Sequence, residues 1–349
     1  MNKIQFDIKQ LVRKNILNLK AYSSARDEFT DFDAKMIFLD ANENPYENGV
    51  NRYPDPQQKN LKAVLAKQKN ISEKNILLGN GSDEVLDLIY RAFCEPGEDN
   101  IITLPPTYGM YTVLANINNI EEQQVQLDKD FQPDVEEIFR KVNMNSKVVF
   151  ICSPNNPSGN LIEQDRIQQI LKRFNGVVVI DEAYIDFTDK KSWISAIKEH
   201  PNLIVTQTLS KAYGLAGIRL GICYASEEII SVLNKIKPPY NVNELTQQRA
   251  LQRTLEEDKV KNEVKSIIEE RAKLQEALST ISFVEKIFFS DANFILARVD
   301  DANKRYDQLI NMGIVVRNRS TQALCENTLR FTVGTTEENK ILIEALKQL

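Results

Sequence analysis

A lysine set among small and polar residues is the first candidate for chemistry in this chain. Lys211 comes directly after Ser210 and eight residues before Arg219. In such a setting the lysine amine can form a Schiff base with a carbonyl compound, while the serine and the arginine can bind a phosphate group. A solvated lysine in a surface loop would have the same local sequence, so both interpretations stay open on these residues alone.

A carboxylate at the end of an apolar run is the second candidate. Asp181 follows the run Val177–Ile180 and lies three residues before Tyr184. Burial at the end of a strand raises the pKa of a carboxyl group unless a cation pairs with it. Asp181 is therefore a candidate for binding a cationic group, and a capping aspartate is the alternative.

A pair of glycines before an amphipathic run offers a place for an anion. Residues 79–82 separate the apolar run 76–78 from apolar residues at helical spacing in 85–90. The first backbone N–H groups of a helix, its dipole and the hydroxyl of Ser82 can together bind a phosphate. Glycines also mark ordinary turns, so the pattern by itself does not decide between the two.

The single histidine narrows the catalytic options. His200 precedes Pro201, so a histidine metal site, a Ser-His-Asp triad and a Cys-His dyad are hard to build. We expect no metal site, and we expect acid–base chemistry to depend on Lys, Asp, Glu or Tyr. The four cysteines lie far apart without a C-x-x-C pair, and no signal-like segment opens the chain. These features predict a reduced, cytoplasmic protein.

Composition and charge exclude several classes of protein. The 349 residues suffice for about two domains with a sizeable core. The 44 Lys and Arg residues against 49 Asp and Glu residues give a formal net charge of -5, which leaves no basic surplus for a nucleic-acid backbone. No apolar run approaches the roughly 20 residues that a membrane helix needs. We therefore expect neither nucleic-acid nor membrane partners.

Short apolar runs alternate with helical patterns over the first two thirds of the chain. The runs that we expect to be strands are 76–78, 100–104, 147–152, 177–180, 203–206 and 220–224. This alternation predicts an α/β fold with a mostly parallel sheet covered by helices on both faces. Ligands bind beyond the carboxyl ends of such strands, where Ser82, Asp181 and Lys211 all lie.

The sequence pattern changes after Lys237–Pro239. Residues 244–279 are charged and amphipathic with few breakers, which predicts one long connecting helix. Beyond it, four short apolar runs and one helical pattern predict a smaller α+β domain. We thus divide the chain into an N-terminal arm of residues 1–40, a large domain of residues 41–243 and a small domain of residues 244–349.

Several motifs in a fixed order resemble one enzyme family. Together with Asp181–Tyr184 and Ser210–Arg219, they are Asn42–Pro45, Tyr53–Asp55, Gly79–Glu84, Pro106–Tyr111, Ser153–Gly159 and Leu329–Gly334. These segments resemble the fold-type I pyridoxal-phosphate aminotransferases of class II, and among them the histidinol-phosphate aminotransferase family. The resemblance covers the chain from about residue 19 to its end. It implies a large domain with a mostly parallel, seven-stranded sheet between helices, and a smaller α+β C-terminal domain.

The resemblance implies pyridoxal 5'-phosphate as the cofactor and gives roles to residues around its ring. Lys211 would bind the cofactor covalently and later move a proton at the substrate carbon. Asp181 would face the pyridine nitrogen and keep it protonated. Tyr184 and Asn156 would donate hydrogen bonds to the phenolic oxygen, and Tyr108 would stack on the ring.

The resemblance also implies how the cofactor phosphate is held. A helix start, a serine and an arginine would surround it. The residues expected there are Gly81, Ser82, Ser210 and Arg219, and Asp83 is expected to bind the cofactor as well. Tyr53 would reach the same phosphate from a neighbouring subunit, so the resemblance implies a homodimer.

Four residues would contact substrates. Arg330 resembles the arginine that binds the carboxylate of glutamate, and Arg317 matches the position that meets a substrate phosphate. An exposed cation at a strand end is the alternative for Arg317. Tyr22 and Asn44 would complete the substrate site, although Ala21 stands where members of the family usually carry proline.

The resemblance implies amino-group transfer from glutamate to imidazole acetol phosphate, which gives histidinol phosphate and 2-oxoglutarate in histidine biosynthesis. An aromatic amino-acid aminotransferase and a phosphothreonine decarboxylase resemble the same subfamily and stay open as alternatives. A non-catalytic domain that senses pyridoxal phosphate is a more remote one, because such regulators normally carry an additional DNA-binding module.

Overall fold

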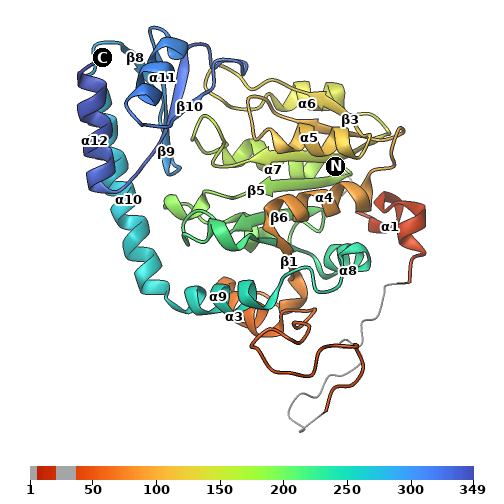
Figure 1. Ribbon diagram of the computed structural model, residues 1–349. Helices are drawn as coiled ribbons and strands as arrows, with labels where there is room; N and C mark the ends of the chain where they lie inside the picture. The colour runs from red at the N-terminus through yellow and green to blue at the C-terminus, as the bar shows by residue number, and fades with distance from the viewer. Residues whose placement is uncertain (1–5, 21–36) are drawn as a thin grey trace.

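The computed structural model describes residues 6–20 and 37–349 (Figure 1). Its helices are α1 (Ile8–Leu11), α2 (Lys14–Leu17), α3 (Lys59–Lys69), α4 (Gly81–Phe93), α5 (Met110–Ile117), α6 (Val135–Lys141), α7 (Gln164–Arg173), α8 (Glu227–Ile236), α9 (Glu244–Leu255), α10 (Glu257–Leu278), α11 (Ala302–Asn311) and α12 (Thr336–Lys347). Its strands are β1 (Ile76–Asn80), β2 (Asn100–Thr103), β3 (Glu121–Gln124), β4 (Ser146–Cys152), β5 (Val177–Asp181), β6 (Leu203–Thr208), β7 (Leu220–Ala225), β8 (Val284–Ile287), β9 (Phe294–Val299), β10 (Arg317–Asn318) and β11 (Thr328–Thr332). None of these helices combines the length and the apolar composition that a membrane span requires.

A seven-stranded sheet forms the centre of the larger part of the molecule, in the order β1-β7-β6-β5-β4-β2-β3. The strands β3, β2, β4, β5 and β6 pair in parallel, and β7 pairs antiparallel with both β6 and β1. This confirms the predicted α/β fold. We did not predict β3, because its sequence Glu-Glu-Gln-Gln is polar and its edge position needs no apolar alternation.

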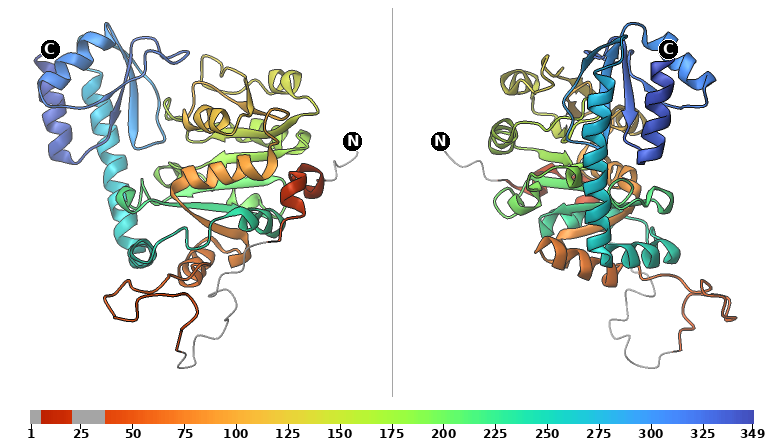
Figure 2. Two further views of the ribbon diagram at one scale, coloured as in Figure 1. Left: turned by 45° about the vertical axis from the view of Figure 1, so that its right-hand side comes forward. Right: turned by 90° about the vertical axis from the view of Figure 1, so that its left-hand side faces the viewer.

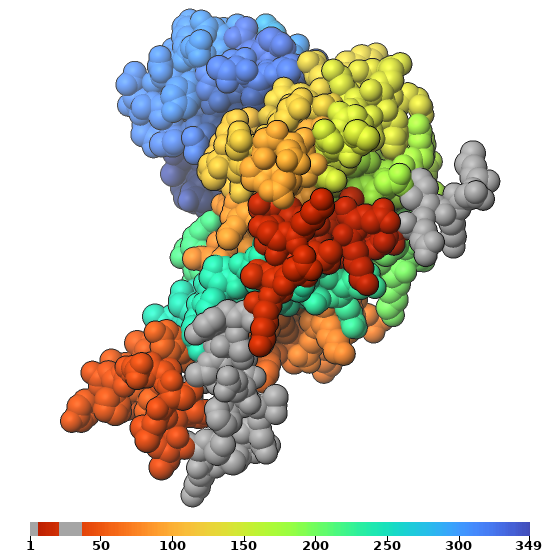
Figure 3. Space-filling model, turned by 90° about the vertical axis from the view of Figure 1, so that its right-hand side faces the viewer, coloured from red at the N-terminus to blue at the C-terminus, as the bar shows by residue number. Residues whose placement is uncertain are grey.

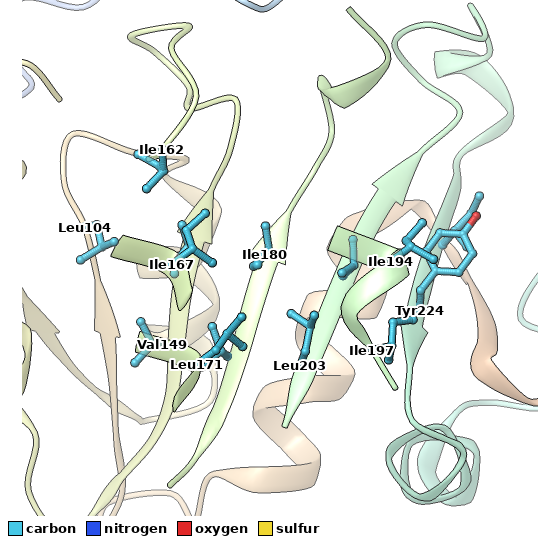
Figure 4. Packing of buried hydrophobic residues seen from close by; sticks show 14 of the residues in the cluster. Leu104, Val149, Ile162, Ile167, Leu171, Ile180, Ile194, Ile197, Leu203 and Tyr224 are labelled. Atoms are coloured by element: carbon cyan, nitrogen blue, oxygen red, sulfur yellow. The ribbon is translucent and has the colours of Figure 1, made fainter. Parts of the chain in front are cut away.

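Helices cover both faces of this sheet, so its strands are apolar on both sides. In β5, Val177 and Val179 pack on the face covered by α4, α5 and α8, while Val178 and Ile180 pack on the face covered by α3, α6 and α7. Figure 4 shows the second face, where Ile167 of α7 lies among the side chains of the strands. Burial on both faces explains why these strands read as continuous apolar runs.

The predicted long helix over 244–279 is wrong at one position, because the chain turns between α9 and α10. Glu256 separates the two helices with φ -86° and ψ 42°. The buried guanidinium of Arg253 holds this corner: its Nε donates to the carbonyl of Tyr213 at 2.9 Å, and its other nitrogens pair with Glu256 and Glu263. Beyond the corner, α10 runs to the second sheet (Figures 1 and 2).

The second sheet has four antiparallel strands in the order β10-β11-β9-β8. One of its faces packs on α10, α11 and α12 in a core of its own, which includes Ile295 and Phe331. Alternate residues of β9 point to the opposite face, where Leu296 joins the core of the seven-stranded sheet. This second face is therefore the one that meets the larger part of the molecule. The domain boundaries at residues 41 and 244 stay predictions.

The N-terminal residues that the structure describes fall into two parts. Residues 6–20 lie against the body, where Ile8, Val12 and Ile16 are buried and Arg13 pairs with Glu95 at 3.0 Å (Figure 3). Residues 37–55 instead form an irregular segment that projects from the body (Figures 2 and 3). It exposes large apolar side chains to solvent, among them Leu39 with 86% of its surface accessible.

Candidate active site

The carboxyl ends of β5 and β6 bring Asp181 and Lys211 to the same edge of the sheet. The two strands pair in parallel, and Asp181 ends β5 opposite Thr206 of β6. Lys211 follows β6 by three residues, and its Nζ lies 5.8 Å from the ring centroid of Tyr184. The prediction that residues after the strands gather at one edge is thus confirmed for these three side chains.

The charges around Lys211 show which groups it faces. Burial is the largest cause that lowers the pKa of its amine, and the positive charges of Arg330 and Arg219 lower this pKa further. Asp181 and Asp83 act in the opposite direction. A half-buried amine with a lowered pKa holds a larger neutral fraction, which is the nucleophilic form.

Asp181 is buried, with 3% of its surface accessible. Burial raises the pKa of its carboxyl group, and hydrogen bonds oppose that rise: Tyr111 donates its hydroxyl to Oδ2 at 2.9 Å, and the N–H of Ala183 donates to Oδ1 at 3.2 Å. Among the residues of known position, no lysine or arginine forms an ion pair with Asp181. A cationic group of a ligand would therefore stabilise the charged form of this carboxyl group.

Tyr111 is a site residue for which the sequence suggested no role. It belongs to the motif 106–111, yet a tyrosine near a helix start reads as ordinary core. The ring is wholly buried and stacks on Phe150 at 4.9 Å. Its partner Asp181 lies 70 positions away in sequence, so only the packing of α5 against the sheet reveals the contact.

Two further tyrosines line the same edge. Tyr184 is buried, and its ring meets the ring of Phe294 edge-on at 5.1 Å. Tyr108 is half-buried and donates its hydroxyl to Asp83 at 3.0 Å. Burial raises the pKa of both phenols, so both stay protonated and remain hydrogen-bond donors at neutral pH.

The start of α4 forms a cradle beside these residues. Gly81 has φ +79°, and its N–H donates to the carbonyl of Arg219 at 2.8 Å. A Cβ at Gly81 would lie 2.7 Å from Nη2 of Arg219, so the glycine makes room for the guanidinium. Asn80, the residue before the helix, makes no side-chain cap. The N–H groups that follow Gly81 in the first turn, including that of Ser82, are thus available to an anion.

Asp83 and Ser210 complete the surroundings of this cradle. Asp83 lies 3.4 Å from Arg219, in a half-exposed pair. The hydroxyl of Ser210 accepts a hydrogen bond from Thr208 at 3.0 Å. Gly81, Ser82 and Asp83 thus lie at the helix start with Arg219 and Ser210 beside them, on elements that β1, β6 and β7 bring together.

Arg330 reaches this edge from the second sheet. It donates through Nη1 to Oδ1 of Asn156, and its guanidinium lies over the ring of Phe294 at 5.0 Å. Burial lowers its pKa to about 10, so the side chain stays a cation at neutral pH. Arg317 pairs with Arg330 across β10 and β11, but its side chain is exposed.

The other predicted residues do not join this cluster within one chain. Asn44 is exposed in the projecting segment, where its Oδ1 accepts a hydrogen bond from the N–H of Tyr46 at 2.9 Å. Tyr53 lies in the same segment and stacks on Tyr240 at 4.5 Å. Tyr22 lies outside the described residues. The roles suggested for these three stay predictions.

Comparison with known proteins explains the arrangement. The model of the family "Aminotransferase class I and II" matches residues 19–346. The chain belongs to the class I and II aminotransferases. The match spans both sheets, so the aminotransferase fold includes the second sheet with Arg317 and Arg330.

Individual aminotransferases are similar over nearly the whole chain. The histidinol-phosphate aminotransferase of Flavobacterium johnsoniae is 66% identical over 345 residues, which are 99% of each chain. A crystal structure of the histidinol-phosphate aminotransferase from Clostridium acetobutylicum is 27% identical, with a TM-score of 0.79 over 86% of this chain and 90% of the other. A structure of the Sinorhizobium meliloti enzyme in complex with pyridoxal-5'-phosphate has a TM-score of 0.78 at 24% identity and covers 85% of this chain and 82% of the other.

Proposed function

We propose that this aminotransferase uses pyridoxal 5'-phosphate to move an amino group between glutamate and imidazole acetol phosphate, which yields histidinol phosphate and 2-oxoglutarate in histidine biosynthesis. The observation that carries the proposal is a half-buried lysine with lowered pKa near a buried carboxyl group, to which no described residue supplies a cation, and near a sheet face that carries arginines. The 66% identity to a histidinol-phosphate aminotransferase supports the choice of substrate.

The residues of the site fit the cofactor group by group. The carboxyl group of Asp181 matches the protonated pyridine nitrogen, because that cation supplies a charged partner that no described residue provides. The amine of Lys211 matches the aldehyde. The uncapped start of α4, with Ser82, Ser210 and Arg219, matches the phosphate dianion.

When bound, pyridoxal phosphate withdraws electrons from the substrate carbon that carries the amino group. Lys211 removes the proton from that carbon at Nζ, because the amine lies at this edge and its lowered pKa favours the neutral form that can accept a proton. Tyr111 holds the carboxylate of Asp181 in place through its hydroxyl. Since Oδ1 of Asn156 accepts a hydrogen bond from Arg330, Nδ2 is the atom of this amide that would donate to the cofactor.

The arginines select anionic substrates. Arg330 binds the carboxylate of glutamate, because its guanidinium is half-buried and planar and can donate two parallel hydrogen bonds. Arg317 lies next to it in the register of β10 and β11, and it adds a second positive charge for the side-chain carboxylate or for a phosphate. Their proximity lets one site accept both substrates in turn.

The active enzyme is a homodimer in which Tyr53 reaches the cofactor phosphate of the partner. The projecting segment supports this assembly, because Ile37, Leu39 and Tyr46 each expose more than four fifths of their surface. A second copy of the chain would bury these apolar side chains. A cytoplasmic location agrees with the four buried, unpaired cysteines.

A spectral titration with amino donors tests the choice of substrate. The cofactor absorption of the wild-type protein should respond to histidinol phosphate at lower concentration than to phenylalanine or phosphothreonine. A preference for phenylalanine would favour an aromatic aminotransferase. Release of carbon dioxide from phosphothreonine would favour a decarboxylase, and no response to any amine would favour a non-catalytic sensor.

Borohydride reduction tests the lysine. Lys211→Ala should keep cofactor through the cradle of Arg219 and α4, yet lose covalent fixation and amino-group transfer. Lys190→Ala is the matched control, since Lys190 is exposed and only approaches Asp189 at 3.8 Å. Fixation of the cofactor on a different lysine in the wild-type protein would refute the assignment of Lys211.

A further inference from the structure

A third arginine lies on the same sheet face as Arg317 and Arg330. Arg317 is directly opposite Arg330 in the antiparallel register, and the N–H of Arg319 continues the pairing by donating to the carbonyl of Thr328 at 2.9 Å. Side chains two residues apart on a strand point to the same face, and directly opposite residues share a face. Leu296, opposite Arg330 on β9, shows that this face meets the seven-stranded sheet.

Arg319 is more buried than Arg317, and no described residue forms an ion pair with it. Its Nε is buried and has no hydrogen-bond acceptor among the residues that the structure describes, and the same is true of Nε in Arg330. Within the same part of the chain no carboxylate forms an ion pair with Arg317, Arg319 or Arg330. The guanidinium groups of Arg319 and Arg330 are half-buried beside the exposed one of Arg317, and such neighbouring cations without an acid are costly to hold unless an anion binds them.

The charge of Arg319 affects the pKa values of two other site residues, Tyr184 and Arg330. Burial raises the pKa of Tyr184, and the charge of Arg319 opposes that rise. Burial also lowers the pKa of Arg330, and the charge of Arg319 lowers it further, more strongly than that of Arg317. Burial and the charge of Arg317 in turn lower the pKa of Arg319 itself. These charge effects agree with the register of the strands, which places Arg319 on the sheet face that carries Arg317 and Arg330.

We propose that Arg319 is a specificity-determining residue that binds the phosphate group of the substrate together with Arg317. This inference rests on the proposed function and extends it, because a phosphate monoester carries nearly two negative charges at neutral pH, whereas each carboxylate of glutamate carries one. Arg330 alone suffices for a carboxylate. The two arginines of β10 and its extension supply the additional positive charge that distinguishes a phosphorylated amine from an unphosphorylated one.

The test compares histidinol phosphate with histidinol, which lacks only the phosphate. Arg319→Gln should lower kcat/KM for histidinol phosphate about 10- to 100-fold, mainly through KM, because a charge-assisted contact is lost. The value for histidinol should not change. Arg319→Lys should restore part of the preference, since lysine keeps the charge but not the planar fork.

Arg298→Gln is the matched control. Arg298 lies opposite Thr328 on the same sheet face, but its guanidinium already donates to the carbonyls of Glu326 and Leu324. This change should leave the ratio between the two substrates as it is in the wild type. Cofactor absorption and the melting temperature of each variant show whether it is folded.

Inorganic phosphate provides a readout that does not depend on the physiological substrate. It should inhibit glutamate turnover competitively, and the inhibition constant should rise about 10-fold in Arg319→Gln. If the wild-type enzyme does not turn over histidinol phosphate, but the inhibition constant for phosphate still rises in Arg319→Gln, the proposed function is refuted and the phosphate site is retained. Equal losses on histidinol phosphate and histidinol, a loss confined to glutamate, or unchanged inhibition by phosphate would each overturn the role of Arg319.

Discussion

The hydrogen bond from Tyr111 to Asp181 allows a sharp test of the site. Tyr111→Phe keeps the buried ring and its stacking on Phe150, and it removes only the hydroxyl that donates to Oδ2 of Asp181 at 2.9 Å. A hydrogen bond to a charged group contributes about 1.5 to 3 kcal/mol. Burial already raises the pKa of Asp181, so loss of this donor destabilises the carboxylate further.

We expect two consequences for the enzyme with bound cofactor. The value of kcat should fall by about one to two orders of magnitude, because about 1.4 kcal/mol corresponds to a tenfold change. The acidic limb of the kcat/KM profile should move to higher pH, since the carboxylate form, which the fold disfavours and the reaction needs, is then lost earlier as the pH falls. Stopped-flow absorbance of the first half-reaction between about pH 5 and pH 9 measures both effects.

Tyr90→Phe is the matched control for this experiment. Tyr90 is equally buried and also stacks on Phe150, at 5.2 Å, but its hydroxyl donates to the carbonyl of Tyr111 at 2.8 Å. This change should cost about 0.5 to 1.5 kcal/mol of unfolding free energy and leave the pH profile in place. If the two variants have the same kcat and the same acidic limb, Tyr111 is structural and the reasoning is refuted.

Three further outcomes follow from the same geometry. Gly81→Ala should weaken cofactor binding about tenfold or more, because a positive φ costs alanine about 1 to 2 kcal/mol and its Cβ would meet a guanidinium nitrogen at 2.7 Å. Gly313→Ala is the control, because Gly313 has the same φ of +79° and open space around it. That variant should bind the cofactor as the wild type does. Arg330→Gln removes a charge that lowers the pKa of Lys211, so the midpoint for covalent uptake of cofactor by the apoprotein should move to higher pH, and an unmoved midpoint would contradict this coupling. Mixing Lys211→Ala with Tyr53→Ala subunits should restore part of the activity, since one site of each mixed dimer is intact; no recovery despite subunit exchange seen by native mass spectrometry would count against shared sites.

Local patterns predicted the fold, and they predicted which candidate site residues follow directly after strands. Strands such as β4 and β5 are buried on both faces, so each appears as an uninterrupted apolar run. Functional side chains follow these runs directly, because the carboxyl ends of parallel strands form the ligand-binding edge. Asp181, Ser210 and Lys211 were recognisable for this reason, and the break before α4 was recognisable from its glycines.

Some features left no local trace in the sequence. The edge strand β3 is polar, so no alternation revealed it. The corner between α9 and α10 occurs without proline or glycine, because it depends on Arg253, whose partner Tyr213 lies 40 positions earlier. Helical propensity and charge pairing therefore predicted one helix where tertiary contacts produce two.

The sequence by itself determined the succession of strands and helices, the lysine and carboxyl group that follow them, and the family to which their order belongs. These properties depend on residues within a few positions of one another, and hydrophobic periodicity records them directly. Only the tertiary structure decided that Tyr111 supports Asp181, that Asn156 meets Arg330 from 174 positions away, and that Arg319 shares a face with two other arginines. Such contacts depend on how helices pack on sheets and on the register between strands. Both involve residues that are distant in sequence, so no short segment of the chain predicts them.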